Sequence, residues 1–303
     1  MNKRSFKKLL LLELKMFLYN PLYVFMSLIL SPLLAIIWFI LKDADPFVVP
    51  STIAGLITTN ATLVFFNSLV NKKKYQFERR LINKVSLNYI YFFASLTFNL
   101  FLNIVGIIII FVIACCNTNQ ILHIININWI IFIYSLLIFW LTTILITYIV
   151  YCLIESEQLA MAIITMFYVV TYNLMGCTFP FYAIVDINWI NAILYIFLNR
   201  YSLNLIQVGY VNALDLNYID QLNKGKYNLN WQIGSSLWIM IAITAIIVSC
   251  LLIIVIIHKA IKRSYIRNIN KITYIKSLKK AKNIEELTEI RQNSKNFIYK
   301  EQK

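Results

Sequence analysis

The sequence predicts an all-α membrane protein with six transmembrane helices. Hydrophobic residues make up 60% of the 303-residue chain, which leaves too little polar surface for a soluble globular protein. Six apolar stretches reach about 18 residues or more, the length that crosses a bilayer core of roughly 30 Å. Of the 28 Lys and Arg residues, 24 fall in three clusters (3–15, 72–84 and 259–303), and six crossings place all three clusters on one side.

The positive-inside rule orients these stretches. Because cytoplasmic loops retain Lys and Arg, both chain ends are expected in the cytoplasm, and the protein is expected as a multi-pass protein of the cell membrane. The net charge of +15 gathers on the cytoplasmic side, which favours anionic inner-leaflet lipid as a partner and argues against nucleic acid. The predicted spans are residues 22–41, 51–70, 89–116, 129–154, 159–177 and 237–257.

Residues 3–19 predict an interfacial helix that lies along the membrane surface before the first span. Basic side chains such as Arg4 share one strip of this helix, and apolar side chains such as Phe17 share the opposite strip. Glu13 falls on the apolar side and interrupts the pattern. Pro21 is expected to end the helix, and a mid-span proline at position 32 is expected to kink the first span.

The charged segment between the second and third spans predicts a short cytosolic amphipathic helix. Phe77, Leu81 and Val85 recur every four residues and share one face, while Glu78 and Arg79 lie on other faces. Two interpretations stay open. The segment is either a positively charged anchor with a solvated face or a helix that docks into a cytosolic partner protein.

The other connections are assigned to the two membrane faces. Residues 117–128 and 201–232 are expected to be polar external loops, and residues 155–158 a tight inner turn. Residues 179–198 are apolar but interrupted by proline and polar residues. Backbone breaks at membrane depth need protein cover, which predicts a short re-entrant or interfacial hairpin on the outer side.

Two units follow from this layout. Residues 1–257 form one transmembrane domain, and residues 258–303 form a basic cytosolic tail. The tail is expected to begin as an amphipathic helix that continues the last span.

The sequence patterns argue against catalysis. His123 and His258 fall on opposite sides of the predicted membrane, so they do not share a site. The six glycines never take Walker A spacing, so any ATP-driven work needs another subunit. The chain is therefore not expected to be an enzyme, and neither a cofactor nor a metal site is predicted. Because the six spans contain no charged residue, a proton- or sodium-coupled carrier is disfavoured.

Neutral polar residues inside the spans are the candidate functional groups. Ser95, Asn99 and Asn103 lie at helical spacing on one face of the third span, and Asn60 and Asn67 are seven residues apart on the second. Such groups must be satisfied within protein, because lipid offers no hydrogen bonds. They either join helices to one another or line a substrate path.

Two short residue patterns occur in addition to the predicted arrangement of spans. Glu78, Arg79 and Leu81 form an acidic, basic and Leu pattern ahead of the third span. A second pattern lies at and after the end of the fifth span. It consists of a small residue, an aromatic residue and a Pro, followed by a Trp and later by a basic residue next to an aromatic one. Its members are Gly176, Phe179, Pro180, Trp189, Arg200 and Tyr201.

Over roughly residues 1–257 the organisation resembles the permease subunits of type-two ABC exporters. That family has an N-terminal interfacial helix, six spans, a cytosolic coupling helix and an external re-entrant hairpin before the last span. The chain departs from the family where Val85 or Ser86 stands in place of a Pro, and in its long basic tail.

The resemblance implies partners and sites. The protein would be half of a twelve-span permease dimer, completed by a second copy or a related permease and driven by ABC-type ATPase subunits. The implied ATPase docking residues are Phe77, Glu78, Arg79, Leu81, Val85, Glu155 and Glu157. The implied external gate comprises Phe179, Pro180 and Trp189.

The implied function is export of a hydrophobic or amphipathic cargo, as in multidrug or peptide efflux, with a peptide, an antibiotic or a lipid-like molecule as candidates. A second hypothesis is a stand-alone membrane immunity or stress protein that sequesters amphipathic toxins without ATP. A membrane-embedded enzyme is disfavoured, because paired acid, base or metal-binding residues are missing.

Overall fold

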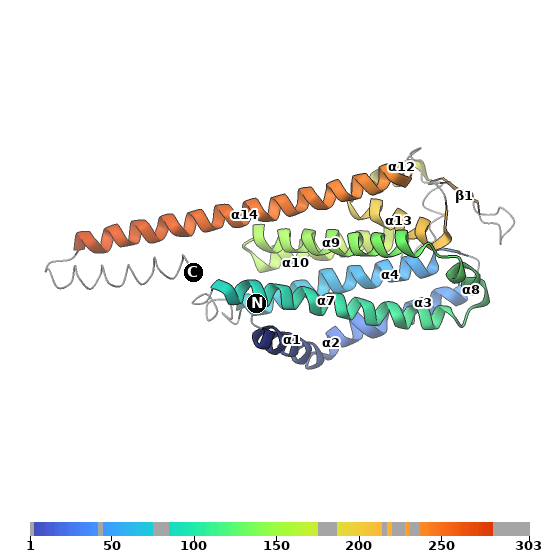
Figure 1. Cartoon of the computed structure of the whole chain (residues 1–303), viewed down its shortest axis with the longest axis horizontal. Coiled ribbons are helices and arrows are strands. Elements are labelled where there is room, and N and C mark those ends of the chain that lie inside the picture. Colours follow the sequence, from blue (N-terminus) through green and yellow to red (C-terminus); the bar gives the residue numbers. More distant parts are fainter. Residues whose placement is uncertain are drawn as a thin grey trace.

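The chain folds into a helical bundle, and one long helix extends far beyond it (Figure 1). The computed structural model describes residues 3–41, 45–74, 85–174, 187–213, 217–219, 228–230 and 237–280. Its elements are α1 (Lys3–Leu18), α2 (Pro21–Val24), the π-helix η1 (Phe25–Ile29), α3 (Leu30–Leu41), α4 (Val48–Thr59), the π-helix η2 (Asn60–Val64), α5 (Phe65–Lys74), α7 (Val85–Ala114), α8 (Thr118–Ile125), α9 (Trp129–Leu153), α10 (Glu157–Leu174), α12 (Asn188–Leu194), α13 (Asn199–Val211), β1 (Asn217–Ile219), β2 (Asn228–Asn230) and α14 (Leu237–Lys280).

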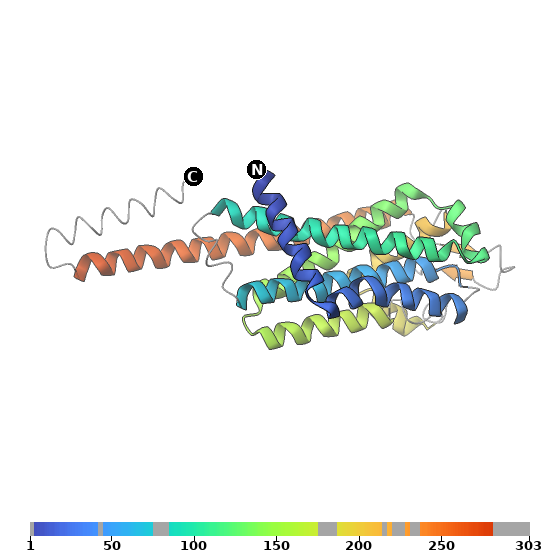
Figure 2. The same cartoon turned by 90° about the horizontal axis from the view of Figure 1, so that it is seen from below.

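Five of the described helical segments are long and apolar enough to cross a membrane. They coincide with the first, second, third, fourth and sixth predicted spans, so the coarse prediction of a helical, multi-pass membrane protein is confirmed. The fifth predicted span corresponds to α10, which lies along the bundle and is described to Leu174 (Figure 2). A sixth crossing there stays a prediction. The five segments are Pro21–Leu41, Val48–Asn71, Ile90–Ala114, Trp129–Leu153 and Leu237–Ile261.

The described parts of the three basic clusters lie toward one end of the bundle (Figures 1 and 2). We call it the α1 end, because it holds α1, the start of α7 and the turn between α9 and α10. The opposite end, which holds α8, α12 and the strands, is called the α8 end. An odd number of crossings between two clusters would place them at opposite ends, so their common location agrees with the charge pattern.

The first span is not a uniform α-helix. Pro21 begins α2, where its missing N–H is harmless and its fixed φ suits the first turn. The hydrogen bonding then widens at η1, and the Leu30 N–H donates to the Phe25 carbonyl. Pro32 stands two residues further on, and in a regular α-helix its ring would collide with the carbonyl four residues back, at Leu28 inside η1. The irregularity therefore occurs at the site that the mid-span proline predicts.

The second span forms the centre of the bundle. In the most apolar 18-residue stretch of this span, 78% is buried inside the bundle. In the corresponding stretch of the last span only 22% is buried, so that helix presents most of its surface outward. Small and branched side chains such as Ile53, Ala54 and Ala61 pack against α3, α7, α9 and α10. The helix changes to π geometry at η2, directly after Thr59.

At the α8 end, a helix replaces the first loop that the sequence predicts. Residues 117–128 contain α8, whose N-terminus is capped by the Asn117 side chain accepting from the backbone N–H groups of Asn119 and Gln120. Gln120 is buried; its Nε2 donates to the Asp45 carbonyl at 3.0 Å, and its Oε1 accepts from Tyr210 at 2.9 Å. A loop reading was wrong here because buried partners satisfy these polar groups.

The prediction of a polar loop over residues 201–232 is also wrong for its first part. Those residues belong to α13, and every residue from Asn199 to Tyr210 is buried except the partly exposed Tyr201. Two of its polar side chains hydrogen-bond to neighbours: Asn199 Nδ2 donates to Thr143 Oγ1 at 3.0 Å, and Asn204 Nδ2 donates to the Tyr195 hydroxyl at 3.0 Å. Further on, β1 and β2 form a short antiparallel ribbon.

The last span continues without interruption to Lys280, so the prediction of a helical start to the tail is confirmed. This helix, α14, runs past the bundle at the α1 end (Figure 1). Lys259 Nζ lies 4.9 Å from the ring centroid of Phe92 and 5.2 Å from that of Tyr148, which attaches α14 to α7 and α9. Residues 281–303 lie outside the described part of the chain.

Candidate functional site

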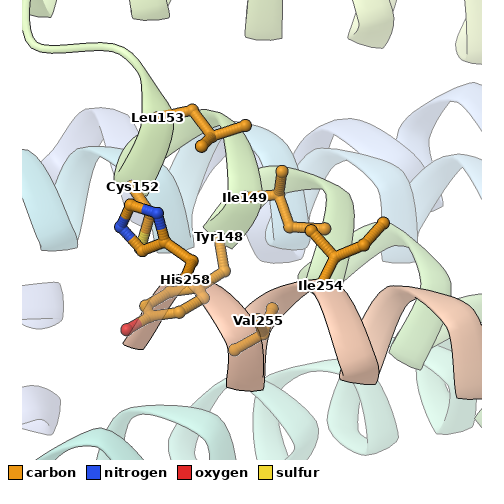
Figure 3. A pocket seen from close by; sticks show the side chains of 7 residues that line it. All are labelled: Tyr148, Ile149, Cys152, Leu153, Ile254, Val255 and His258. Atoms are coloured by element: carbon orange, nitrogen blue, oxygen red, sulfur yellow. The ribbon is translucent and has the colours of Figure 1, made fainter. Parts of the chain in front are cut away.

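A small crevice between α9 and α14 is too small to hold a ligand. Its volume is about 10 Å³, which is roughly the space of one water molecule. Figure 3 shows the His258 imidazole beside Cys152 at this crevice, surrounded by aliphatic side chains. The lining residues are Tyr148, Ile149, Cys152, Leu153, Ile254, Val255 and His258.

A far larger cavity of about 410 Å³ lies where α1 packs against α5 and α7. This volume falls within the roughly 300–1,000 Å³ of typical small-molecule sites. We call it the Glu13 cavity, after the charged residue in its wall. Its lining residues are Leu12, Glu13, Met16, Phe17, Tyr19, Asn20, Tyr23, Val64, Phe65, Ser68, Asn71, Tyr91, Ser95, Phe98, Asn99 and Leu102.

The carboxylate of Glu13 is buried in this wall, with only 4% of the residue exposed. Ser95 Oγ donates to Glu13 Oε1 at 2.6 Å, and Ser68 Oγ donates to Oε2 at 3.4 Å. The hydrogen bonds connect α1 to α7 and to α5. A buried carboxylate is stable only when such donors or a cation compensate for its lost hydration.

The position of Glu13 follows from how α1 crosses the bundle. Figure 2 shows α1 running obliquely over the other helices instead of along them. Phe17, on the apolar strip of α1, packs edge-on against Phe98 of α7 with ring centroids 5.6 Å apart. Because Glu13 lies one turn before Phe17 on the same face, docking that face turns the carboxylate inward. In the sequence, Glu13 interrupts the apolar strip of the predicted interfacial helix, and this interruption was the one available sign that the carboxylate is buried.

A cluster of amides lies deeper, behind the cavity. Asn60 Nδ2 donates to Asn103 Oδ1 at 2.7 Å, and Asn103 Nδ2 donates to Asn99 Oδ1 at 3.2 Å. Asn99 Oδ1 also accepts from Trp140 Nε1 at 2.9 Å, and Asn99 Nδ2 donates to the Asn60 carbonyl at 2.9 Å. All three Asn residues are buried, so the cluster joins the second, third and fourth spans.

The amide cluster coincides with the π-helix of the second span. The Asn60 carbonyl accepts from Phe65 N–H, five residues on, and from Asn99 Nδ2. A π-helical turn leaves room for a second donor at such a carbonyl, and such turns are frequent at functional sites. The side chain of Asn99 therefore belongs to two structures, the cavity wall and the helix irregularity.

The structure divides the five predicted substrate-path residues into three groups. Ser95 and Asn99 line the Glu13 cavity, while Asn60 and Asn103 lie behind it in the amide cluster. Asn67 is half-buried and lies outside the cavity lining. The amide cluster agrees with the interpretation that these residues join helices to one another. Ser95 and Asn99 line a cavity, and a substrate path there stays a prediction.

A second polar cluster lies at the start of α13. The Arg200 guanidinium is fully buried and lies 5.7 Å from the ring centroid of Tyr195. Burial lowers the pKa of Arg200 to about 10, and the neighbouring Tyr195 opposes that shift. The guanidinium thus stays charged at neutral pH.

Much of the predicted docking site and gate falls outside the described residues. Phe77, Glu78, Arg79 and Leu81 lie in the undescribed segment 75–84, and Val85 is the first residue of α7. Two further docking candidates, Glu155 and Glu157, are exposed at the turn between α9 and α10.

Of the predicted gate, only Trp189 is described. It lies on α12 with 67% of its surface exposed. Phe179 and Pro180 fall in segment 175–186, outside the described residues.

Comparisons of the chain with protein-family models, with curated proteins and with solved structures find no match. The likeness to exporter permeases therefore stays a proposal.

Proposed function

We propose that the protein is the membrane-spanning permease subunit of an exporter, driven by a separate ATPase subunit, for a hydrophobic or amphipathic cargo. The Glu13 cavity carries the proposal. Its volume of about 410 Å³ suits a small molecule, and its wall combines aromatic and aliphatic side chains with a few polar groups. Binding sites for small molecules have this composition.

The location of the cavity supports coupling to a cytosolic motor. The segment proposed to dock the ATPase connects α5 with α7, and both helices contribute side chains to the cavity. A force applied to that segment would therefore move two cavity walls. The π-helix at Asn60, where the helix departs from regular hydrogen bonding, is the proposed hinge of this movement.

The proposal is tested by co-purification with the ATPase, and by ATP-dependent uptake into inside-out vesicles. Phe77→Asp and Leu81→Asp each place a negative charge on the apolar face of the docking segment. We expect both variants to lose the ATPase and the uptake. Asn83→Asp adds the same charge on another face and serves as the matched control.

Two results would count against the proposal. Co-purification that survives both apolar-face substitutions rejects the docking assignment. Protection of cells against an amphipathic toxin when every partner ATPase is deleted favours the stand-alone sequestering protein instead.

A further inference from the structure

We propose that the Glu13 cavity binds an amphipathic organic cation, with its positive group at Glu13 and its apolar body among the aromatic side chains. The inference names the cargo class and so rests on the proposed function. It is carried by three properties of the cavity: the sign of its charge, its aromatic lining and its size.

The described residues that line the cavity carry a net negative charge. Among the residues that line it in the described part of the chain, Glu13 is the only one that carries a formal charge; none is Lys, Arg or His. With 4% of Glu13 exposed, water screens the carboxylate poorly, and a positive ligand gains more from it than at the surface. An anionic ligand of the same shape would be repelled. The amphipathic cargo is therefore cationic.

Aromatic rings supply the second property. Six line the cavity, on α1, in the turn that follows it, and on α2, α5 and α7; they are Phe17, Tyr19, Tyr23, Phe65, Tyr91 and Phe98. The faces of aromatic rings attract organic cations, and their apolar area favours the rest of an amphipathic ligand. A carboxylate among aromatic rings selects an organic ammonium or phosphonium over a small metal ion, which requires several oxygen ligands.

The size and the opening of the cavity limit the cargo. A volume of about 410 Å³ accommodates a small molecule but not a long peptide. Tyr19, with 87% of its surface exposed, and the exposed Asn71 mark the rim, whereas Ser95 and Asn99 form the buried floor. Their amide and hydroxyl groups hydrogen-bond to protein atoms, so the carboxylate and the rings dominate ligand recognition.

The test compares tetraphenylphosphonium with tetraphenylborate, which have the same shape and opposite charge. Equilibrium binding of the labelled phosphonium is measured on the purified full chain in maltoside detergent. We expect saturable binding that the borate does not compete away. Equal competition by the two ions would show that charge is irrelevant and would overturn the inference, without the use of any variant.

Variants then locate the charge. Glu13→Gln keeps an acceptor for Ser95 but removes the charge, and we expect the phosphonium affinity to fall at least about tenfold. Glu13→Asp keeps the charge and is expected to retain more affinity than Glu13→Gln. Glu157→Gln removes the same charge at an exposed turn and should change the affinity less than about twofold. Unchanged binding by folded Glu13→Gln would overturn the assignment.

Two sources of the cation are distinguished by lipid. If phosphatidylethanolamine competes with the phosphonium while phosphatidylglycerol does not, the site takes a lipid with an ammonium headgroup. If neither lipid competes, it takes a soluble amphipathic cation. Both results support a cation site. Competition by phosphatidylglycerol alone would overturn it, because that headgroup carries no positive charge.

Failure of the exporter proposal can be distinguished from failure of the cation-site proposal, because the phosphonium-binding assay contains no ATPase. Phosphonium binding without ATP-dependent transport would uphold the cation site and reject the exporter. ATP-dependent transport of a neutral cargo by a protein that does not bind phosphonium would reject only the cation site.

Discussion

The amide cluster shows how individual polar side chains become fixed inside an apolar bundle. Trp140 Nε1 can only donate, so Asn99 must turn its Oδ1 toward the indole. Asn99 Nδ2 then faces the Asn60 carbonyl, which can only accept. Asn103 Nδ2 donates to Asn99 Oδ1, and Asn60 Nδ2 donates to Asn103 Oδ1. The Trp140 N–H, which can only donate, and the Asn60 carbonyl, which can only accept, thus orient all three side-chain amides.

Asn99→Leu is expected to destabilise the protein by about 2 kcal/mol. Asn99 makes three interhelical or intrahelical hydrogen bonds, and such bonds average about 0.6 kcal/mol each within membranes. The Trp140 N–H would also lose its acceptor in a buried position. The free energy of unfolding in mixed micelles measures the effect.

Asn67→Leu is the matched control for this substitution. Asn67 is half-buried on the adjacent span, and the described part of the chain shows no side-chain hydrogen bond to it. Its replacement should change the free energy of unfolding by less than about 0.5 kcal/mol. Equal losses in the two variants would contradict the importance of the amide cluster.

Close helix packing rests on glycines, and their surroundings differ. A Cβ on Gly209 of α13 would lie 2.8 Å from the backbone nitrogen of Phe132 and 3.0 Å from its Cα. A Cβ on Gly106 of α7 would meet the end of the Leu56 side chain at 2.6 Å. Backbone atoms cannot move without shifting a whole helix, whereas a Leu side chain can change rotamer.

Gly209→Ala should therefore cost more than Gly106→Ala. We expect losses of about 3 and about 1 kcal/mol, the two limits usual for overpacking a buried site. The Gly209 carbonyl also accepts from Asn128 N–H at 2.9 Å, so displacement of α13 would loosen the start of α9. Melting temperatures in one detergent give the order of the two variants, and the reverse order would contradict the backbone contact.

For the molecule as a whole, charge and helix direction agree. The start of α1, the end of α5 and the extension of α14 lie at one end of the bundle (Figure 1). The buried Arg200 lies in the packed layer that α13 forms with α9 and α14. This arrangement accommodates an even number of crossings between the clusters, and the orientation in the membrane follows from the positive-inside rule.

Labelling with an impermeant thiol reagent tests this orientation. In a chain whose five cysteines are replaced by Ala, single cysteines at Lys74 and Asn119 report on the α1 end and the α8 end. Only the cysteine at position 119 should react in intact cells, and a reporter fused after Lys303 should be cytoplasmic. Labelling at position 74 from outside would reject both the topology and the exporter proposal.

Local composition was enough to locate most spans. The second predicted span began three residues late, and the last predicted span ended four residues before the apolar segment does. The irregularity before Pro32 and the break at Pro21 were also predictable, because a proline acts within one helical turn of its own backbone. The common face of Ser95, Asn99 and Asn103 followed from helical spacing. These properties depend on near neighbours in the chain.

Other features depend on residues far apart in sequence. Glu13 approaches Ser95, 82 residues away, only because α1 crosses α7, and Asn60 meets Asn103 across 43 residues. Residues 201–211 were predicted to be part of a polar loop, but Asn204 hydrogen-bonds to Tyr195 just before α13, and Tyr210 hydrogen-bonds to Gln120 of α8. Chain order and hydropathy therefore located the long apolar helices and the breaks at their prolines, but not α8 and α13. Helix packing alone decided which polar groups are buried together, because hydrogen bonds and carboxylate burial depend on distances in space.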